Sequence, residues 1–178
     1  MNGLLKRVLV LALVTAPSAG VAQTPNHSAD DGRILSGLLV PSCQPGRSGF
    51  AFLESKTPSD MLEYLSQSAA KNVLSPYQEA LRDLMQRNTS RQPLPSGLGC
   101  DGVRIASRSA IEQAIAKGWE GTRLTLSLPG YNASGDRAVV YEGMQCGNGL
   151  RCGSGYFIEL HKSNGGWVED KRIEAWFS

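Results

Sequence analysis

The first 22 residues constrain the fold most, because they decide which part of the chain remains to fold and in which redox environment. Lys6 and Arg7 form a short basic segment, and an apolar run follows over residues 8–14. Gly20 and Ala22 then place small side chains where a signal peptidase accepts them. This order is typical of a secretory signal peptide, which is removed from the mature protein. We therefore predict cleavage after Ala22 and a periplasmic or secreted location.

The alternative to cleavage is an N-terminal membrane anchor that stays in place. A transmembrane helix needs about 20 apolar residues, and the apolar segment over residues 4–16 is shorter than that. The full chain has 18 basic and 16 acidic side chains, and cleavage removes Lys6 and Arg7, which leaves 16 of each. A mature chain without net charge gives no electrostatic reason to bind nucleic acid or an anionic membrane. We expect no nucleic-acid partner and no stable membrane insertion after cleavage.

The mature chain contains four cysteines, an even number that predicts two disulfides in an oxidising compartment. Three pairings are possible, and we favour Cys43 with Cys100 and Cys146 with Cys152. The second pair is local in the sequence, whereas the first closes a loop of nearly sixty residues. Chain entropy predicts that closing such a loop stabilises the fold by about 4 kcal/mol.

The remaining residues suit one domain over residues 33–178, preceded by a polar lead at residues 23–32 that is predicted to be disordered. The first half of the domain shows helical periodicity and capping residues. Pro58 and Pro76 each follow a hydroxyl residue that can cap a helix N-terminus, and Ser109 begins a capping box. Predicted helices therefore lie at residues 34–39, 58–69, 76–85 and 110–117, with short strands at residues 49–54 and 103–106.

The second half of the domain alternates apolar and polar residues with a period of two, which predicts strands. These strands lie at residues 124–128, 137–145, 155–162 and 167–177, and Asn164-Gly165 is a strong hairpin signal before the last one. Trp167 and Trp176 have opposite parity, so the last strand requires a bulge or cover on both faces. We predict an α+β fold, with N-terminal helices packed on an antiparallel sheet of about four strands.

Several motifs of the second half occur together. A Pro-Gly-Tyr-Asn turn lies within residues 126–132, a Cys-Gly loop at 146–155 ends in Cys-Gly-Ser-Gly, and the Asn-Gly hairpin precedes a Trp-Phe-Ser end at 176–178. With this combination the chain resembles a group of exported bacterial domains of unknown function. The resemblance spans residues 33–178 and is specific only after Leu126, and the Cys-to-Cys loop here is longer than in that pattern. It implies an α+β fold and export, but no activity.

Carboxylates on the predicted strands suggest a hydrolase as one alternative function. Glu142, Glu159 and Glu174 lie on three strands that can be neighbours, with His161 and Arg172 close in sequence. Paired carboxylates can divide acid and base roles, so Glu142, Glu159 and His161 are the candidate residues of an extracytoplasmic hydrolase. Charged residues on an open sheet face are nevertheless ordinary, and no Ser has the surroundings of a nucleophile elbow.

Cys146 and Cys152 suggest a second alternative, a thiol–disulfide exchange enzyme. Redox pairs usually have two intervening residues at a helix N-terminus, whereas here five residues intervene before a strand, which favours a structural bridge. Four glycines around this connection match no phosphate-binding spacing and are attributed to relief of backbone strain: Gly147, Gly149, Gly153 and Gly155. With all cysteines paired, two distant histidines, His27 and His161, suggest no metal site.

We therefore favour a non-enzymatic domain of the bacterial envelope, stabilised by two disulfides, that binds a protein partner or a small ligand. Its loops or its open sheet face would supply the binding surface. The sequence assigns no catalytic residue, cofactor or metal.

Overall fold

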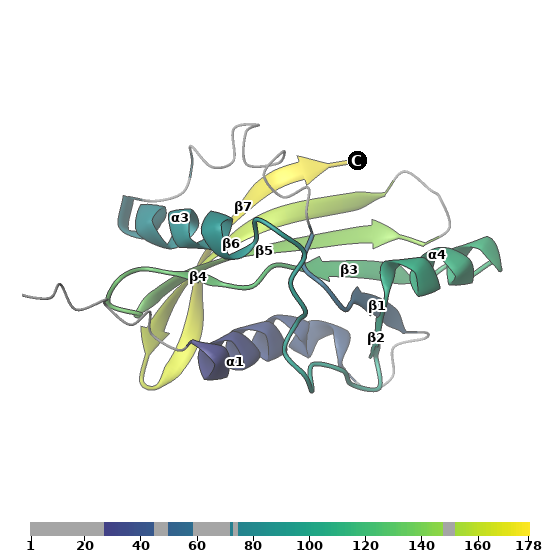
Figure 1. Cartoon of the computed structure of the whole chain (residues 1–178), viewed down its shortest axis with the longest axis horizontal. Coiled ribbons are helices and arrows are strands. Elements are labelled where there is room, and N and C mark those ends of the chain that lie inside the picture. The colour runs from purple at the N-terminus through teal and green to yellow at the C-terminus, as the bar shows by residue number, and fades with distance from the viewer. Residues whose placement is uncertain (1–26, 45–49, 59–71, 73–74, 148–151) are drawn as a thin grey trace, which may run out of the picture.

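A computed structural model describes residues 27–44, 50–58, 72, 75–147 and 152–178 of the chain. The predicted signal peptide and the apolar stripe of the predicted helix at 58–69 lie outside these residues. Figure 1 shows a single sheet with helices on both of its faces. The α+β class predicted from the sequence is therefore correct.

The sheet has seven strands in the described part of the chain. Six lie in the order β2-β1-β3-β5-β6-β7, and the short β4 pairs with β5. Their bounds are β1 (Ala51–Glu54), β2 (Val103–Ala106), β3 (Thr122–Leu126), β4 (Gly130–Tyr131), β5 (Arg137–Cys146), β6 (Gly153–Ser163) and β7 (Gly166–Phe177).

The sheet is mixed, which corrects the prediction of about four antiparallel strands. The four predicted strands β3, β5, β6 and β7 are indeed antiparallel neighbours. At the end of the sheet opposite β7 the strands are parallel, because β1 pairs in parallel with both β2 and β3. Parallel strands need a crossover connection, and the helix between β2 and β3 provides one.

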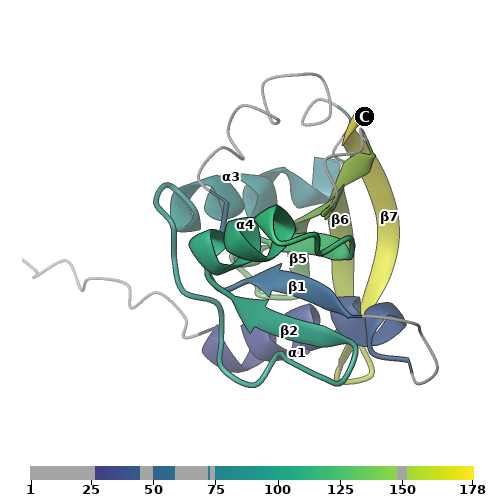
Figure 2. The ribbon, with the colours of Figure 1, turned by 90° about the vertical axis from the view of Figure 1, so that its right-hand side faces the viewer.

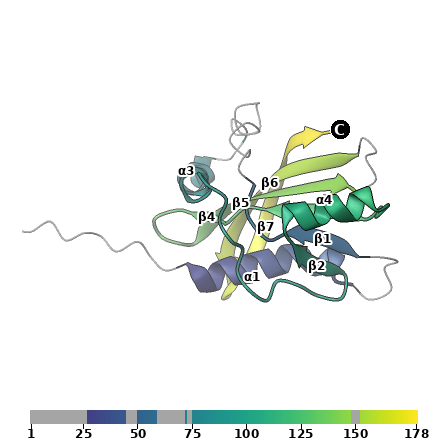
Figure 3. The same ribbon diagram turned by 45° about the vertical axis from the view of Figure 1, so that its right-hand side comes forward.

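Three α-helices are described, and they cover the two faces of the sheet unequally. Helix α1 (Ser28–Leu39) continues into the short 3₁₀ helix η1 (Val40–Ser42). Helix α3 (Gln78–Arg87) follows the 3₁₀ helix η3 (Ser75–Tyr77), and α4 (Arg108–Ala116) follows β2. Figures 2 and 3 show α3 and α4 on the face of the sheet opposite α1.

Helix α1 begins at Ser28, within the lead that was expected to be disordered up to residue 32. Two acidic residues, Asp30 and Asp31, lie in its first turn, where they favour the helix dipole. Asp31 is also buried, at 4% exposure. Its hydrogen-bond partners, the half-buried Arg87 and the buried Tyr131, order this part of the chain, and nothing in the local sequence indicates them.

Helix α4 starts two residues earlier than its capping box suggested. Ser107, not Ser109, is the N-cap, and its hydroxyl accepts a hydrogen bond from the Ala110 N–H at 3.2 Å. The helix ends before Gly118, whose φ of +89° provides the left-handed conformation common after a helix.

Two apolar cores lie on the two faces of the sheet. Successive side chains of a strand point to opposite faces, so Val140 and Ile158 belong to the core under α1, whereas Val139 and Phe157 belong to the core under α3. Strands β5 and β6 are therefore buried on both sides.

The hairpin between β6 and β7 confirms two sequence predictions. Asn164 and Gly165 have φ values of 50° and 79°, the left-handed conformations that an Asn-Gly hairpin turn requires. The ladder contains two register shifts, which together preserve parity, so Trp167 packs on the α1 side of the sheet and Trp176 beside Tyr141 on the α3 side. At one shift Glu159 pairs with Lys171 and Leu160 with Glu169, which leaves Asp170 as the extra residue.

All four cysteines are paired in the favoured combination. Cys43 is joined to Cys100 and Cys146 to Cys152, with Cα–Cα distances of 5.8 and 5.6 Å. The first disulfide joins the end of η1 to the segment just before β2, the edge strand of the sheet. It therefore ties the helix of one face to the parallel part of the sheet.

Candidate functional site

The residues of the predicted hydrolase do not form one site. Glu142 lies on the same face of β5 as Val140, toward α1, and an ion pair joins it to Arg172. Glu159 lies two residues from Phe157 on β6 and is fully buried on the opposite face, toward α3. Glu174 pairs with Tyr156, which pairs with Glu142, so it shares the α1 face. The sheet itself separates Glu142 from Glu159 and His161.

His161 instead joins a polar cluster that the sequence did not indicate. Its Nδ1 lies 2.7 Å from Oδ1 of Asp170, the bulge residue of β7. The Tyr77 hydroxyl donates a hydrogen bond to the same carboxylate and accepts one from Arg137 Nη1 at 3.1 Å. Burial, together with the hydrogen bond to Asp170, raises the pKa of Tyr77 to about 12. These contacts attach the start of α3 to three strands, a structural role.

A cavity lies between the N-terminus of α1, helix α3 and the turn after β4. We name it the α1–α3 cavity; its volume is about 540 Å³. His27 and Tyr131 form one wall, where their rings stack with centroids 4.0 Å apart and planes 15° from parallel. Glu79, Arg82 and Gln86 of α3 form the other wall.

Buried hydrogen bonds hold the Tyr131 wall in place. Asp31 accepts the Tyr131 hydroxyl at 2.8 Å and two hydrogen bonds from Arg87, at 3.0 and 2.7 Å. Asp83 accepts the Tyr131 backbone N–H at 2.8 Å. Burial, together with the charge and hydrogen bond of Asp31, raises the pKa of Tyr131 well above its ordinary value. Tyr131 is therefore a neutral donor at physiological pH.

A glycine brings this wall close to α3. A Cβ on Gly130 would lie 2.0 Å from the backbone nitrogen of Leu84 and 2.2 Å from the carbonyl oxygen of Ala80. Only glycine lets β4 approach the helix backbone so closely. The Pro-Gly-Tyr-Asn turn seen in the sequence therefore has a packing reason, and it places Tyr131 at the cavity.

The α3 wall presents charged and polar groups that are not engaged elsewhere. Glu79, Arg82 and Gln86 follow one another at helical spacing and are exposed. Within the described residues, none of their side chains makes a hydrogen bond or an ion pair. The cavity thus combines an aromatic wall with a free carboxylate, a free guanidinium and a free amide.

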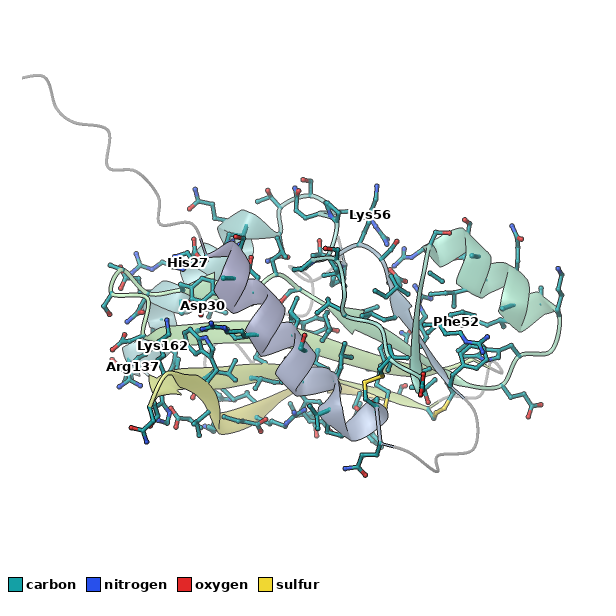
Figure 4. All side chains as sticks on the ribbon, turned by 90° about the horizontal axis from the view of Figure 1, so that it is seen from below. His27, Asp30, Phe52, Lys56, Arg137 and Lys162 are labelled. Atoms are coloured by element: carbon teal, nitrogen blue, oxygen red, sulfur yellow. A yellow bond between two sulfur atoms is a disulfide. The ribbon has the colours of Figure 1, made fainter. Side chains whose placement is uncertain are left out.

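Figure 4 shows His27 and Asp30 at the start of α1, with Lys162 and Arg137 at the same end of the molecule. Lys162 Nζ lies 2.9 Å from Asp30 Oδ2, and the Trp167 Nε1–H donates to Asp30 Oδ1 at 3.3 Å. Although burial opposes it, these hydrogen bonds lower the pKa of Asp30. They fasten the first turn of α1, and with it His27, to the β6–β7 hairpin.

Sequence analysis missed this cavity because its residues come from three distant segments. His27 was placed in the disordered lead, Glu79 had no role within the helix predicted at residues 76–85, and Arg87 lay beyond the end of that helix. Tyr131 was noticed within a motif, without a role. The motif was the one available signal, since a tyrosine directly after a tight Pro-Gly turn has a defined position.

The described residues were also compared with what a redox site, a metal site and a membrane-spanning helix each require. The Cys146–Cys152 pair is joined, and β6 rather than a helix begins after it. No group of three or more His, Cys, Asp or Glu side chains within the described ranges could hold a metal ion. None of the helices in the described part of the chain has the length and apolar character needed to cross a membrane.

No family model, no curated protein and no solved structure matches the chain. The resemblance to exported bacterial domains therefore stays a prediction.

Proposed function

We propose that the protein is an exported binding domain that holds a small zwitterionic ligand with a flat apolar part in the α1–α3 cavity. Free aromatic amino acids and the ends of short peptides have this chemistry. The observation that carries the proposal is the buried Asp31, which fixes Tyr131 opposite the unpaired charges of α3. Two disulfides support a location outside the cytosol, where such bonds persist.

The cavity is suited to a small molecule rather than to a protein surface. Ligand sites of small molecules commonly have volumes of about 300–1,000 Å³ and combine aromatic walls with a few polar groups. The α1–α3 cavity has about 540 Å³ and both kinds of wall. Of the two binding roles left open by the sequence, the small ligand is the one that this geometry favours.

Rigidity of the aromatic wall supports the proposal. Asp31, Asp83 and Arg87 hold the Tyr131 hydroxyl, backbone and ring surroundings before any ligand arrives. Affinity increases when groups need not be ordered on binding. The flat part of the ligand would lie against the His27 and Tyr131 rings.

The charges of α3 define the other half of the ligand. Glu79 can accept an ammonium group and Arg82 can donate to a carboxylate, and the two residues lie three apart on one helix face. Glu79 and Arg82 form no ion pair with each other, so both charges are available to a ligand. A zwitterion would pair with both and would leave no uncompensated charge in the cavity.

Binding should be tested with the processed chain, starting at residue 23, and a set of free amino acids and dipeptides. Thermal unfolding identifies the ligands, and isothermal titration calorimetry measures their affinities. We expect saturable binding of aromatic zwitterions and weaker binding of the same compounds with a blocked amino or carboxyl group. Failure of every zwitterion to bind at millimolar concentration would overturn the proposal.

Variants then locate the site. Glu79→Gln and Arg82→Gln should each weaken binding by about tenfold or more, since each removes one charged hydrogen bond. Glu112→Gln on α4 and Lys117→Gln at its C-cap are matched control variants that change charges of the same sign far from the cavity, and should leave affinity unchanged. Equal affinities in all four variants would place the ligand elsewhere and contradict the proposal.

A further inference from the structure

A buried carboxylate on the α4 side of the molecule is surrounded by three arginines. Glu54, the last residue of β1, is fully buried. Arg91 Nη2 lies 2.6 Å from its Oε2, and Arg108 Nε lies 3.2 Å from its Oε1. Arg123 Nη2 also donates to Oε1. Among the described residues, one negative charge thus faces three positive charges, which leaves an excess of two.

Two of these arginines have donors that no group in the described part of the chain uses. Arg123 Nε is buried and has no hydrogen-bond partner among the described residues. Arg108 binds Glu54 through Nε, and its two terminal nitrogens make no hydrogen bond to the described part of the chain. Burial lowers the pKa of Arg123, but an arginine starts so far above neutrality that it stays charged. Within the described residues, the positive charge of this cluster therefore exceeds the charge of its acceptors.

A small cavity of about 30 Å³ lies beside these two arginines, and we name it the arginine pocket. Arg108 and Arg123 line it together with Thr125, Gln145 and Trp176. The Gln145 side chain is exposed and has no hydrogen-bond partner within the described ranges. A space of this size holds about two water-sized groups, so one or two oxygen atoms of a ligand would enter it and the remainder would extend into solvent.

The pocket lies where the backbone adds to the positive potential. Glu54 ends β1, and Arg108 is the first residue of α4, directly after the parallel strand β2. Ligands of open sheets with parallel strands bind outside the carboxyl ends of those strands. The N-terminus of α4 also carries the positive end of a helix dipole, which has the same sign as the arginine excess.

We propose that the arginine pocket binds an oxyanion group, such as a carboxylate, sulfate or phosphate, through Arg108 and Arg123. Guanidinium groups match the geometry of these anions, because parallel N–H donors can bind two oxygens. The anion would pair with the unused Arg123 Nε. A singly charged anion would offset one of the two excess positive charges, and a doubly charged anion would offset both. Glu54 would then hold the arginines in position and would not itself touch the ligand.

The site is independent of the α1–α3 cavity, since the two share no residue. Its oxyanion can be a free inorganic ion or the acidic group of a larger molecule. Acetate, sulfate and phosphate are therefore the probes, and each is titrated at constant ionic strength against chloride.

The decisive variant is Arg108→Gln, because Arg108 is the more exposed arginine and Glu54 keeps its other two partners without it. We expect saturable binding of at least one oxyanion by calorimetry, and a loss of affinity of about tenfold or more in Arg108→Gln. Arg104→Gln on β2 is the matched control, with the same change in charge outside the pocket, and should bind like the unaltered protein. The Arg123 Nε–H signal in NMR spectra should shift along the same binding curve.

A purely structural arginine cluster gives a different result. The variant Arg108→Gln would then unfold at a lower temperature by the same amount with and without oxyanion, and stabilisation by salts would rise without saturation in all variants. That outcome would overturn the proposal. So would an Arg123 Nε–H signal whose chemical shift stays constant as the anion is added. Variants Glu79→Gln and Arg82→Gln should leave oxyanion binding intact, so failure of the α1–α3 cavity as a ligand site would not affect this one.

Discussion

Trp176 lays its indole ring across Gly155, its pairing partner in the β6–β7 ladder. A Cβ on Gly155 would lie 2.1 Å from Trp176 Nε1, which donates a hydrogen bond to the Tyr141 hydroxyl at 2.8 Å. Sequence analysis attributed this glycine and Gly153 to relief of backbone strain, but neither has a positive φ. Their role is to leave room for the ring.

The variant Gly155→Ala should therefore be destabilised by about 1–3 kcal/mol, because Trp176 must move and lose its bond to Tyr141. Urea unfolding, followed by tryptophan fluorescence, measures this change. Gly37→Ala is the control, since Gly37 is exposed in α1 with nothing within 4 Å of a new Cβ. That substitution should stabilise the protein by up to about 1 kcal/mol. Equal effects in both variants would contradict the packing role of Gly155.

Replacing Asp31 should loosen the aromatic wall of the α1–α3 cavity. The variant Asp31→Asn keeps the size of the side chain but removes the charge that pairs with Arg87, and we expect a loss of about 2 kcal/mol. Asp30→Asn, one residue earlier, breaks more exposed contacts and should cost less than about 1 kcal/mol. Both values come from urea unfolding at pH 7. A larger loss in Asp30→Asn would show that the buried network is not the main anchor of α1.

The two disulfides should contribute unequally to stability. They span 57 and 6 residues of sequence, and chain entropy predicts contributions of about 4 and about 2 kcal/mol. Paired Cys→Ser substitutions at Cys43 and Cys100, and separately at Cys146 and Cys152, test this by urea unfolding. A greater loss from the short loop would mean that native-state contacts, rather than chain entropy, determine the contributions.

Tyr77 should make stability fall at alkaline pH. Its pKa is raised from 10.0 to about 12 in the folded protein, so the unfolded chain releases this proton first. The stabilisation is complete below pH 10 and is lost as pH rises toward 12. In Tyr77→Phe, the fall in unfolding free energy over this range should be shallower, by at most about 1.4 kcal/mol per pH unit. Parallel curves for the two proteins would contradict the pKa shift.

Local patterns explain the part of the fold that the sequence predicted. Strands β3, β5, β6 and β7 follow from alternation and from the Asn164-Gly165 turn, because both signals act within a few residues. The parallel strands β1 and β2 were not placed in the sheet, although a strand–helix–strand order around α4 is the usual sign of parallel pairing. The parallel pairing at this end of the sheet could therefore have been predicted from the order of the elements.

The candidate site was beyond local patterns for a physical reason. Asp31 becomes ordered through Arg87 and Tyr131, which lie 56 and 100 residues away in the sequence. Asp170, the partner of His161, is the extra residue of a bulge in β7, and the position of a bulge depends on tertiary packing. The separation of Glu142 from Glu159 could have been predicted, because the pairing register of two strands fixes which face of the sheet each residue occupies.

If the signal peptide is removed as predicted, the place of His27 in the cavity wall would link maturation to the proposed binding. Four residues would separate it from the new amino terminus created by processing at Ala22. The precursor would carry an apolar leader at this distance from the cavity, and the processed chain a free ammonium group. Cleavage of the signal peptide would then also prepare the cavity to bind a charged ligand. An affinity tag for binding experiments therefore belongs after Ser178, at the other end of the chain.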